Sequence, residues 1–195
     1  MIDLDGVIEG LDGRVVARPP VLVVAIDDEH IELVLGDVAP PSTVRRRWSL
    51  PVGVNTLRRH ELESDPPRPE ELTNAIGRVV DHIDDAAREL PDLMHAATVV
   101  GVGASFVTAA AVEIGRHDLD EIHGFVLDRA AAEDVFRTLA VESSAARAHN
   151  PGLPPEEVDA SVAECCAVVA AMRRLRLDGL IVWGLPTDRA KVGPS

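Results

Sequence analysis

The feature that most constrains the fold is a continuous apolar run at residues 21–26, which Asp27 and Asp28 end abruptly. A run of this length, bounded by turn-forming residues, is typical of a strand buried on both faces. After residues 27–30, Ile31, Leu33 and Leu35 recur at every second position, which is the period of a second strand. The short connection leaves no room for a crossover helix. The pattern therefore predicts an antiparallel hairpin and argues against an open parallel sheet.

Apolar periodicity also predicts the elements that follow this hairpin. Strands are expected at residues 44–50, 96–102 and 180–183, and helices at residues 69–90, 105–114, 129–141 and 154–175. Pro69 with Glu70 and Glu71 is typical of a first helical turn. This order of elements resembles the ribonuclease-H-like half of actin-like proteins. We therefore expect an α/β fold with a mixed sheet and helices on both faces.

The length of 195 residues suits one domain rather than two. We expect that domain at residues 21–195, after an N-terminal arm or hairpin at residues 1–20 that is rich in glycine and ends at Pro19 and Pro20. Aromatic residues make up only 3%, so Val, Leu, Ile and Ala must form the core. Cys165 and Cys166 are neighbours, a spacing that suits neither a disulfide framework nor a zinc site.

The net charge limits the partners of the chain. A formal charge of -14 at pH 7 repels nucleic acid, polyphosphate and anionic membranes. Arginines cluster at residues 45–47 and 173–176, at the edges of predicted elements, which favours solvated faces. The sequence has no charged leader with an apolar stretch and no run of about 18 apolar residues. We expect a cytoplasmic protein that binds neither nucleic acid nor membrane.

Several short segments resemble one family of actin-like phosphatases, the exopolyphosphatase and guanosine-pentaphosphate phosphohydrolase (Ppx/GppA) family. Residues 25–33 (AIDDEHIEL) are similar to the Asp-Ile-Gly-Gly-Gly-Ser-Thr-Glu-Leu turn that opens the second half of these enzymes. The other matches are a Leu-Pro-Leu-Gly segment at residues 49–57 followed by Asp65-Pro66-Pro67, a glycine turn at residues 101–105, and His123-Gly124. The resemblance covers about residues 21–190. It implies an actin-like half without the partner half that supplies one wall of the cleft.

The departures from this family fall on its phosphate-binding positions. Asp27, Asp28 and Glu29 replace the three glycines, whose bare backbone N–H groups face a phosphate in such enzymes. At about 5 Å and an effective dielectric constant of about 20, each carboxylate would repel a phosphate charge by roughly 3 kcal/mol. The leading aspartate and two arginines of the family are Ala25, Thr56 and Thr187 here. The resemblance thus implies a loop that has lost its phosphate.

The acidic turn offers a metal hypothesis. Asp27, Asp28, Glu29 and His30 together present hard oxygen ligands and one imidazole, which suit Mg²⁺ or Mn²⁺. The alternative is a polar hairpin turn, because Asp is common in such turns. No other cofactor is expected. A nuclease of the ribonuclease H type is disfavoured, because residues 101–103 bring no acidic side chain to the fourth strand.

Two further candidate sites follow from the remaining matches. Gly101, Gly103, Ala104 and Ser105 lead into a helix, whose free N–H groups favour an anion. The alternative there is a strand-to-helix turn capped by Ser105. Glu32 is the one family carboxylate still in place and is a candidate base or metal ligand. A single Glu on an alternating strand is otherwise typical of a solvent-facing position.

Two functions are compatible with this pattern. The first is a non-catalytic domain that keeps the fold for binding or assembly, as a homodimer or with a separate partner chain on the face left by the missing half. The second is a phosphohydrolase acting on polyphosphate or a guanosine polyphosphate, which would need a second protomer and a divalent metal.

Overall fold

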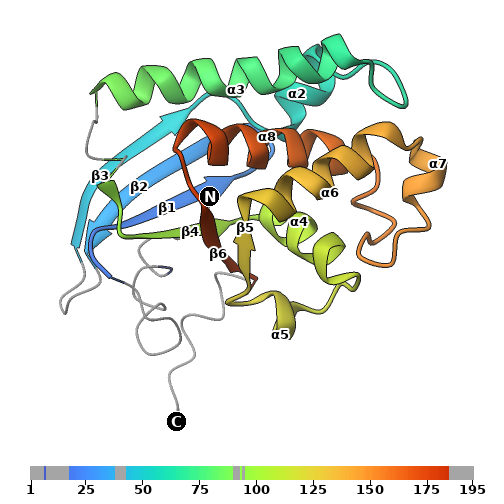
Figure 1. Ribbon diagram of the computed structural model, residues 1–195. Coiled ribbons are helices and arrows are strands. Elements are labelled where there is room, and N and C mark those ends of the chain that lie inside the picture. Colours follow the sequence, from blue (N-terminus) through green and yellow to red (C-terminus); the bar gives the residue numbers. More distant parts are fainter. Residues whose placement is uncertain (1–6, 8–17, 38–42, 90–92, 94, 185–195) are drawn as a thin grey trace.

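The predicted hairpin lies in the middle of a mixed sheet. The structure is a computed structural model that describes residues 7, 18–37, 43–89, 93 and 95–184, and its six strands are ordered β3-β2-β1-β4-β6-β5 (Figure 1). The strands are β1 (Val21–Ile26), β2 (Ile31–Asp37), β3 (Thr43–Leu50), β4 (Thr98–Val102), β5 (Val126–Asp128) and β6 (Gly179–Trp183). The first three strands are antiparallel, whereas β4 and β6 run parallel to β1.

The described helices form a layer over one face of this sheet (Figure 1). They are α2 (Val54–His60), α3 (Pro69–Glu89), α4 (Ala104–Ile114), α5 (Leu119–Ile122), α6 (Arg129–Val141), α7 (Ser144–Arg147) and α8 (Ser161–Arg174). Helix α8 is central, because it packs against α3, α4 and α6. Its first twelve residues are all buried, as the apolar run there requires. The buried apolar side chains of these helices form one cluster with Leu22, Val24 and Ile26 of β1.

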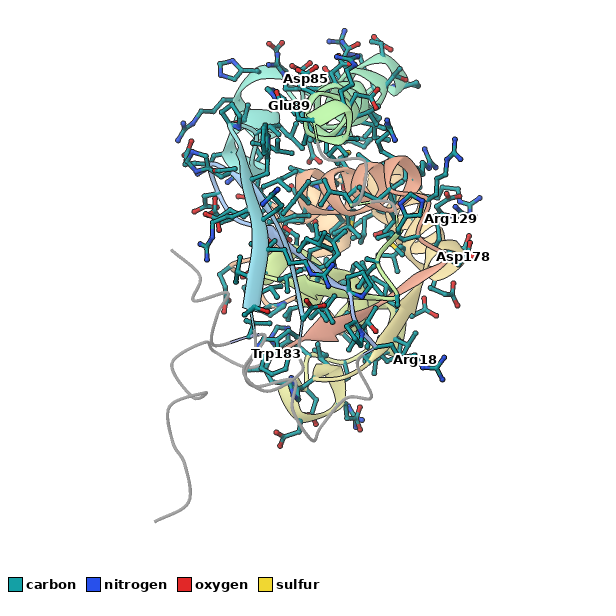
Figure 2. All side chains as sticks on the ribbon, turned by 90° about the vertical axis from the view of Figure 1, so that its left-hand side faces the viewer. Arg18, Asp85, Glu89, Arg129, Asp178 and Trp183 are labelled. Atoms are coloured by element: carbon teal, nitrogen blue, oxygen red, sulfur yellow. The ribbon has the colours of Figure 1, made fainter. Side chains whose placement is uncertain are left out.

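The second face of the sheet carries a smaller buried cluster. Val21, Val23, Val100 and Trp183 belong to it, together with Val7. In Figure 2, Trp183 lies at the opposite end of the view from α3, which carries the labelled Asp85 and Glu89. In the described ranges helices α2 to α8 cover the first face, whereas the helical residue that packs on the second face is Val7. The arm or hairpin predicted at residues 1–20 lies mostly outside the described residues.

The sequence pattern placed most elements correctly and one boundary wrongly. The mixed α/β sheet, the hairpin and the helix from Pro69 are confirmed. The helix predicted at residues 154–175 begins only at Ser161. Residues 155–160 form successive turns, with the Glu157 N–H donating to the Pro154 carbonyl. Strand β5 and helices α2, α5 and α7 were not predicted, since they are short.

The two arginine clusters lie beside carboxylates. The pairs are Arg45 with Asp37 at 2.6 Å, Arg47 with Glu32 at 3.7 Å, Arg173 with Glu133 at 3.0 Å, and Arg174 with Asp84. These contacts agree with the interpretation of the clusters as solvated, ion-paired faces. Across the described helices, none has the length and apolar character that a membrane crossing requires.

Candidate functional site

The acidic turn between β1 and β2 satisfies its own backbone. The Asp27 N–H donates to the His30 carbonyl at 3.0 Å, which closes the hairpin. The Asp27 carboxylate then accepts the N–H groups of Glu29 at 2.8 Å and His30 at 2.7 Å. In a glycine loop such N–H groups are available to a phosphate. Here a carboxylate of the turn itself takes the place of the anion.

The outer side of this turn packs against the start of α2. The Val54 N–H donates to the Asp27 carbonyl at 3.1 Å, and the Asn55 N–H donates to the Asp28 carbonyl at 2.8 Å. A Cβ atom at Gly53 would lie 2.5 Å from the Glu29 nitrogen, so only glycine fits there. The turn residues avoid positive φ, since Arg176 alone among the described non-glycine residues has it. Side chains at residues 27–30 therefore fit this turn without backbone strain.

The turn gives the metal hypothesis no geometric support. Glu29 accepts the Asn55 amide at 3.3 Å and lies 3.7 Å from Arg59, while His30 is 4.0 Å from Asp27. One oxygen of Asp27 is already engaged by two N–H groups. In the described ranges no three His, Cys, Asp or Glu side chains are grouped as a metal ion would need. The polar hairpin turn, the alternative reading, is what the contacts describe.

The second glycine turn lies directly beside the first. Gly103 has φ of +112°, and a Cβ atom there would collide with the Ile26 carbonyl. A Cβ atom at Gly101 would lie 2.6 Å from the Phe106 ring, so both glycines allow close packing. Helix α4 begins after Gly103 without a side-chain cap, and the buried Ser105 hydroxyl has no hydrogen-bond partner among the described residues. Uncapped N–H groups are thus present where the sequence predicts an anion site, and the alternative of a Ser105 cap is not seen.

The remaining candidate base, Glu32, lies on the other side of the sheet. Its neighbour across the ladder is Ala25, which belongs to the second cluster, whereas α4 covers the first face. Its carboxylate is 3.7 Å from Arg47 and 18% exposed. The structure therefore does not bring Glu32 together with Ser105, and its geometry is that of a cross-strand ion pair.

Sequence reasoning missed one buried acid at this edge of the sheet. Glu164 lies in the first turn of α8, is 2% exposed, and has one carboxyl oxygen without a described hydrogen-bond partner. Burial, with help from Glu157 and Asp28, raises the pKa of Glu164 to about 8, against the opposing effects of Thr108 and Arg58. The raised pKa favours the protonated form of this group. The signal in the sequence was a single acid inside the apolar run of residues 162–172.

These features meet at one edge because of the topology. Strands β1 and β4 are parallel, so the turn after β1 and Gly103 after β4 lie at the same edge. Helix α8 leads back to β6, which is parallel to β4, so its first turn returns to this edge. His123 packs its ring edge-on against Trp183, with centroids 4.5 Å apart, and Trp183 pairs with Val102 at the end of β4, so His123 also lies near this edge. Thr187 lies outside the described residues.

The architecture has close counterparts among solved structures. An exopolyphosphatase-like protein aligns with a TM-score of 0.81 and 22% identity over 92% of this chain. The type II variant of the Aquifex aeolicus Ppx/GppA phosphatase aligns with a TM-score of 0.79 and 22% identity over 94% of this chain. The chain has the fold of the Ppx/GppA phosphatases. An exopolyphosphatase from Cytophaga hutchinsonii aligns less closely, with a TM-score of 0.73 and 15% identity over 92% of this chain.

The match to these Ppx/GppA structures is partial in length. The chain covers 62%, 59% and 58% of the three proteins, so it corresponds to about three fifths of each. No protein-family model matches the sequence, and a search of the curated proteins finds no match. The likeness at this identity concerns the fold, and the chemistry must be argued from the site.

Proposed function

We propose that this chain is a non-hydrolytic domain, a pseudoenzyme that keeps the Ppx/GppA fold for binding or assembly. The observation that carries the proposal is the Asp27 carboxylate, which accepts the two N–H groups of Glu29 and His30. A phosphate at this turn would have to displace an internal anion and approach Asp28 and Glu29.

A phosphate-release assay tests this proposal. The purified chain is incubated with polyphosphate or with guanosine pentaphosphate, in the presence of Mg²⁺ or Mn²⁺. We expect phosphate release no faster than in buffer alone. Release that is proportional to protein concentration, and that is lost in a folded Ser105→Ala variant, would contradict the proposal and establish a hydrolase.

One observation favours the second function, a phosphohydrolase completed by a second protomer and a divalent metal. The α4 N-terminus at Gly103 and Ser105 keeps uncapped N–H groups beside the turn. These groups are able to bind an anion, even though the N–H groups of the neighbouring turn already donate to the Asp27 carboxylate. Mixing the chain with a candidate partner half in the same assay distinguishes this function, since activity would appear only in the mixture.

The assembly part of the proposal has its own test. We propose a homodimer. The alternative is a separate partner chain that binds on the face left by the missing half. In the described part of the chain the exposed large apolar side chains are Val44, Leu119, Val126 and Val141, on four different elements. Light scattering at micromolar concentration is expected to give twice the monomer mass of 20.9 kDa. A monomer mass would contradict the homodimer.

A further inference from the structure

A cavity lies between α2, α7 and the start of α8. Its volume is about 530 Å³, which is within the range of small-molecule sites. Residues 27–30 and 101–105 do not line it, but Asn55 and Arg59 of its lining contact Glu29, so it borders the acidic turn. Nothing in the proposed function accounts for it.

Three arginines line this cavity, and they differ in how they are held. Arg147 is buried, with 5% of its side chain exposed, and its guanidinium binds Asp65 at 3.1 Å and the Leu139 carbonyl at 3.3 Å. Its Nε atom is buried and has no hydrogen-bond partner among the described residues. Arg59 is exposed and lies 3.7 Å from Glu29. Arg58 is exposed and makes no ion pair or hydrogen bond within the described ranges.

The start of α8 forms another wall of the cavity. Val162 and Ala163 line it, and their N–H groups donate to no described acceptor. The neighbouring N–H groups are used, since Ser161 donates to the Glu157 carbonyl and Glu164 donates to the Ala160 carbonyl. No side chain caps this helix. Two backbone donors near the positive end of a 14-residue helix therefore belong to residues that line the cavity.

Of the three carboxylates that line the cavity, Asp65 is ion-paired, whereas Glu63 and Asp159 are exposed. Asp65 accepts the Ser144 N–H at 2.9 Å and pairs with Arg147, and these contacts hold the pKa of Asp65 below its ordinary value. Glu63 interacts electrostatically with Arg68, outside the cavity. The donors that remain are Arg58 and the two N–H groups of α8.

We propose that this cavity binds a small oxyanion, a phosphate or carboxylate group, through Arg58 and the N–H groups of Val162 and Ala163. Arg147 supplies a fixed positive charge that its buried contacts hold in place. Arginine and helix N-termini are the donors that proteins commonly use for such groups. The site goes beyond the proposed function and does not depend on it, because it uses none of the residues of the Asp27 turn.

Calorimetric titration with inorganic phosphate, pyrophosphate and citrate, at constant ionic strength, tests this site. We expect saturable binding of at least one anion, and the three probes separate a phosphate ligand from a carboxylate ligand. Arg58→Ala should weaken that binding about tenfold or more, because a charge-assisted hydrogen bond is lost. In nitrogen-15 NMR spectra the amide signals of Val162 and Ala163 should shift on binding.

Arg88→Ala is the matched control, since Arg88 is an exposed arginine on α3 that pairs only with Asp85 in the described structure. It removes the same charge and should leave the affinity within twofold, because solvent screens an exposed charge. Arg58 is itself exposed, so its variant should keep the wild-type circular dichroism and melting temperature. Absence of saturable binding up to the millimolar range, or an equal loss of affinity in both variants, would overturn the site. Neither result bears on phosphate release.

Discussion

At the scale of single residues, Asp27 shows how one side chain replaces a ligand. A loop built from glycine leaves its N–H groups unsatisfied until an anion arrives, whereas Asp27 satisfies two of them permanently. This arrangement is an Asx turn, in which a short acidic side chain binds the backbone two and three residues ahead. The Asp27 carboxylate therefore satisfies donors of its own turn and stabilises the hairpin at the same time.

Asp27→Ala is expected to lower the free energy of unfolding by about 0.5–2 kcal/mol, as losses of comparable side-chain caps do. Urea denaturation monitored by circular dichroism measures this change. Asp85→Ala on α3 is the control, because Asp85 is exposed and pairs only with the neighbouring Arg88. It should change the stability by less than about 0.5 kcal/mol. Equal effects would mean that packing on α2, and not Asp27, sets the turn.

The buried carboxyl group of Glu164 should make the stability of the protein depend on pH. Burial raises its pKa from the ordinary value of 4.5 to about 8, so the folded state binds the proton more tightly than the unfolded state. Its contribution is fully present below pH 4.5 and is lost as the pH rises toward 8. Glu164→Gln removes this loss, which reaches about 1.4 kcal/mol per pH unit in the window.

Urea denaturation at several pH values between 5 and 8 compares Glu164→Gln with the wild type. The wild type should lose stability across this range, whereas the variant should lose less. Glu113→Gln, at an exposed position of α4, should follow the wild type. Parallel curves for the wild type and Glu164→Gln would show that the buried carboxyl group is not protonated.

At the scale of elements, α2 and α4 begin at glycines for the same steric reason. Gly53 lies against the backbone of the acidic turn, and Gly103 lies against the Ile26 carbonyl. Each glycine lets a helix start immediately beside the end of β1. The two N-termini and the turn thus form one packed unit, whose shape depends on the absence of side chains at these two positions.

Gly53→Ala is expected to destabilise the protein by about 1–3 kcal/mol, because its Cβ atom would lie 2.5 Å from a backbone nitrogen that has no room to move. Gly77→Ala is the matched control, since nothing lies within 4 Å of a Cβ atom there. That change should instead stabilise α3 by up to about 1 kcal/mol through helix propensity. Thermal unfolding of both variants measures the contrast, and a stable Gly53→Ala protein would contradict the packing described.

At the scale of the whole molecule, the sheet separates two unequal cores. The larger one lies under the helices, and the smaller one on the second face includes Val7, far from the rest in sequence. Val7 is 1% exposed, so at least this residue of the first twenty is part of the packed structure. The side chains of the second core are buried within the single chain, so both faces of the sheet carry a packed core.

Val7→Asp should destabilise the fold by about 3 kcal/mol or more, because it buries an unpaired charge against Val23 and Trp183. Val141→Asp is the control, since Val141 is 75% exposed at the end of α6. It should stay within about 0.5 kcal/mol of the wild type. Equilibrium unfolding in urea distinguishes the two. A tolerated Val7→Asp would mean that the second core is complete without Val7.

The sequence alone determined the elements whose signal is local. The hairpin, the helix from Pro69 and the strand at residues 98–102 follow from apolar periodicity and turn residues, since these depend only on neighbours along the chain. The same local signal identified the acidic turn as the departure from the family. Short elements such as β5 could not be predicted from local periodicity, because a three-residue strand exists only through its pairing with β6.

The tertiary structure decided what each candidate residue does. The fold places the Asp27 carboxylate on the N–H groups of its own turn, and burial, together with Glu157 and Asp28, raises the pKa of Glu164. The cavity of Arg58 and Arg147 likewise joins elements about ninety residues apart. Such properties arise from burial and long-range proximity, which no periodicity along the chain encodes.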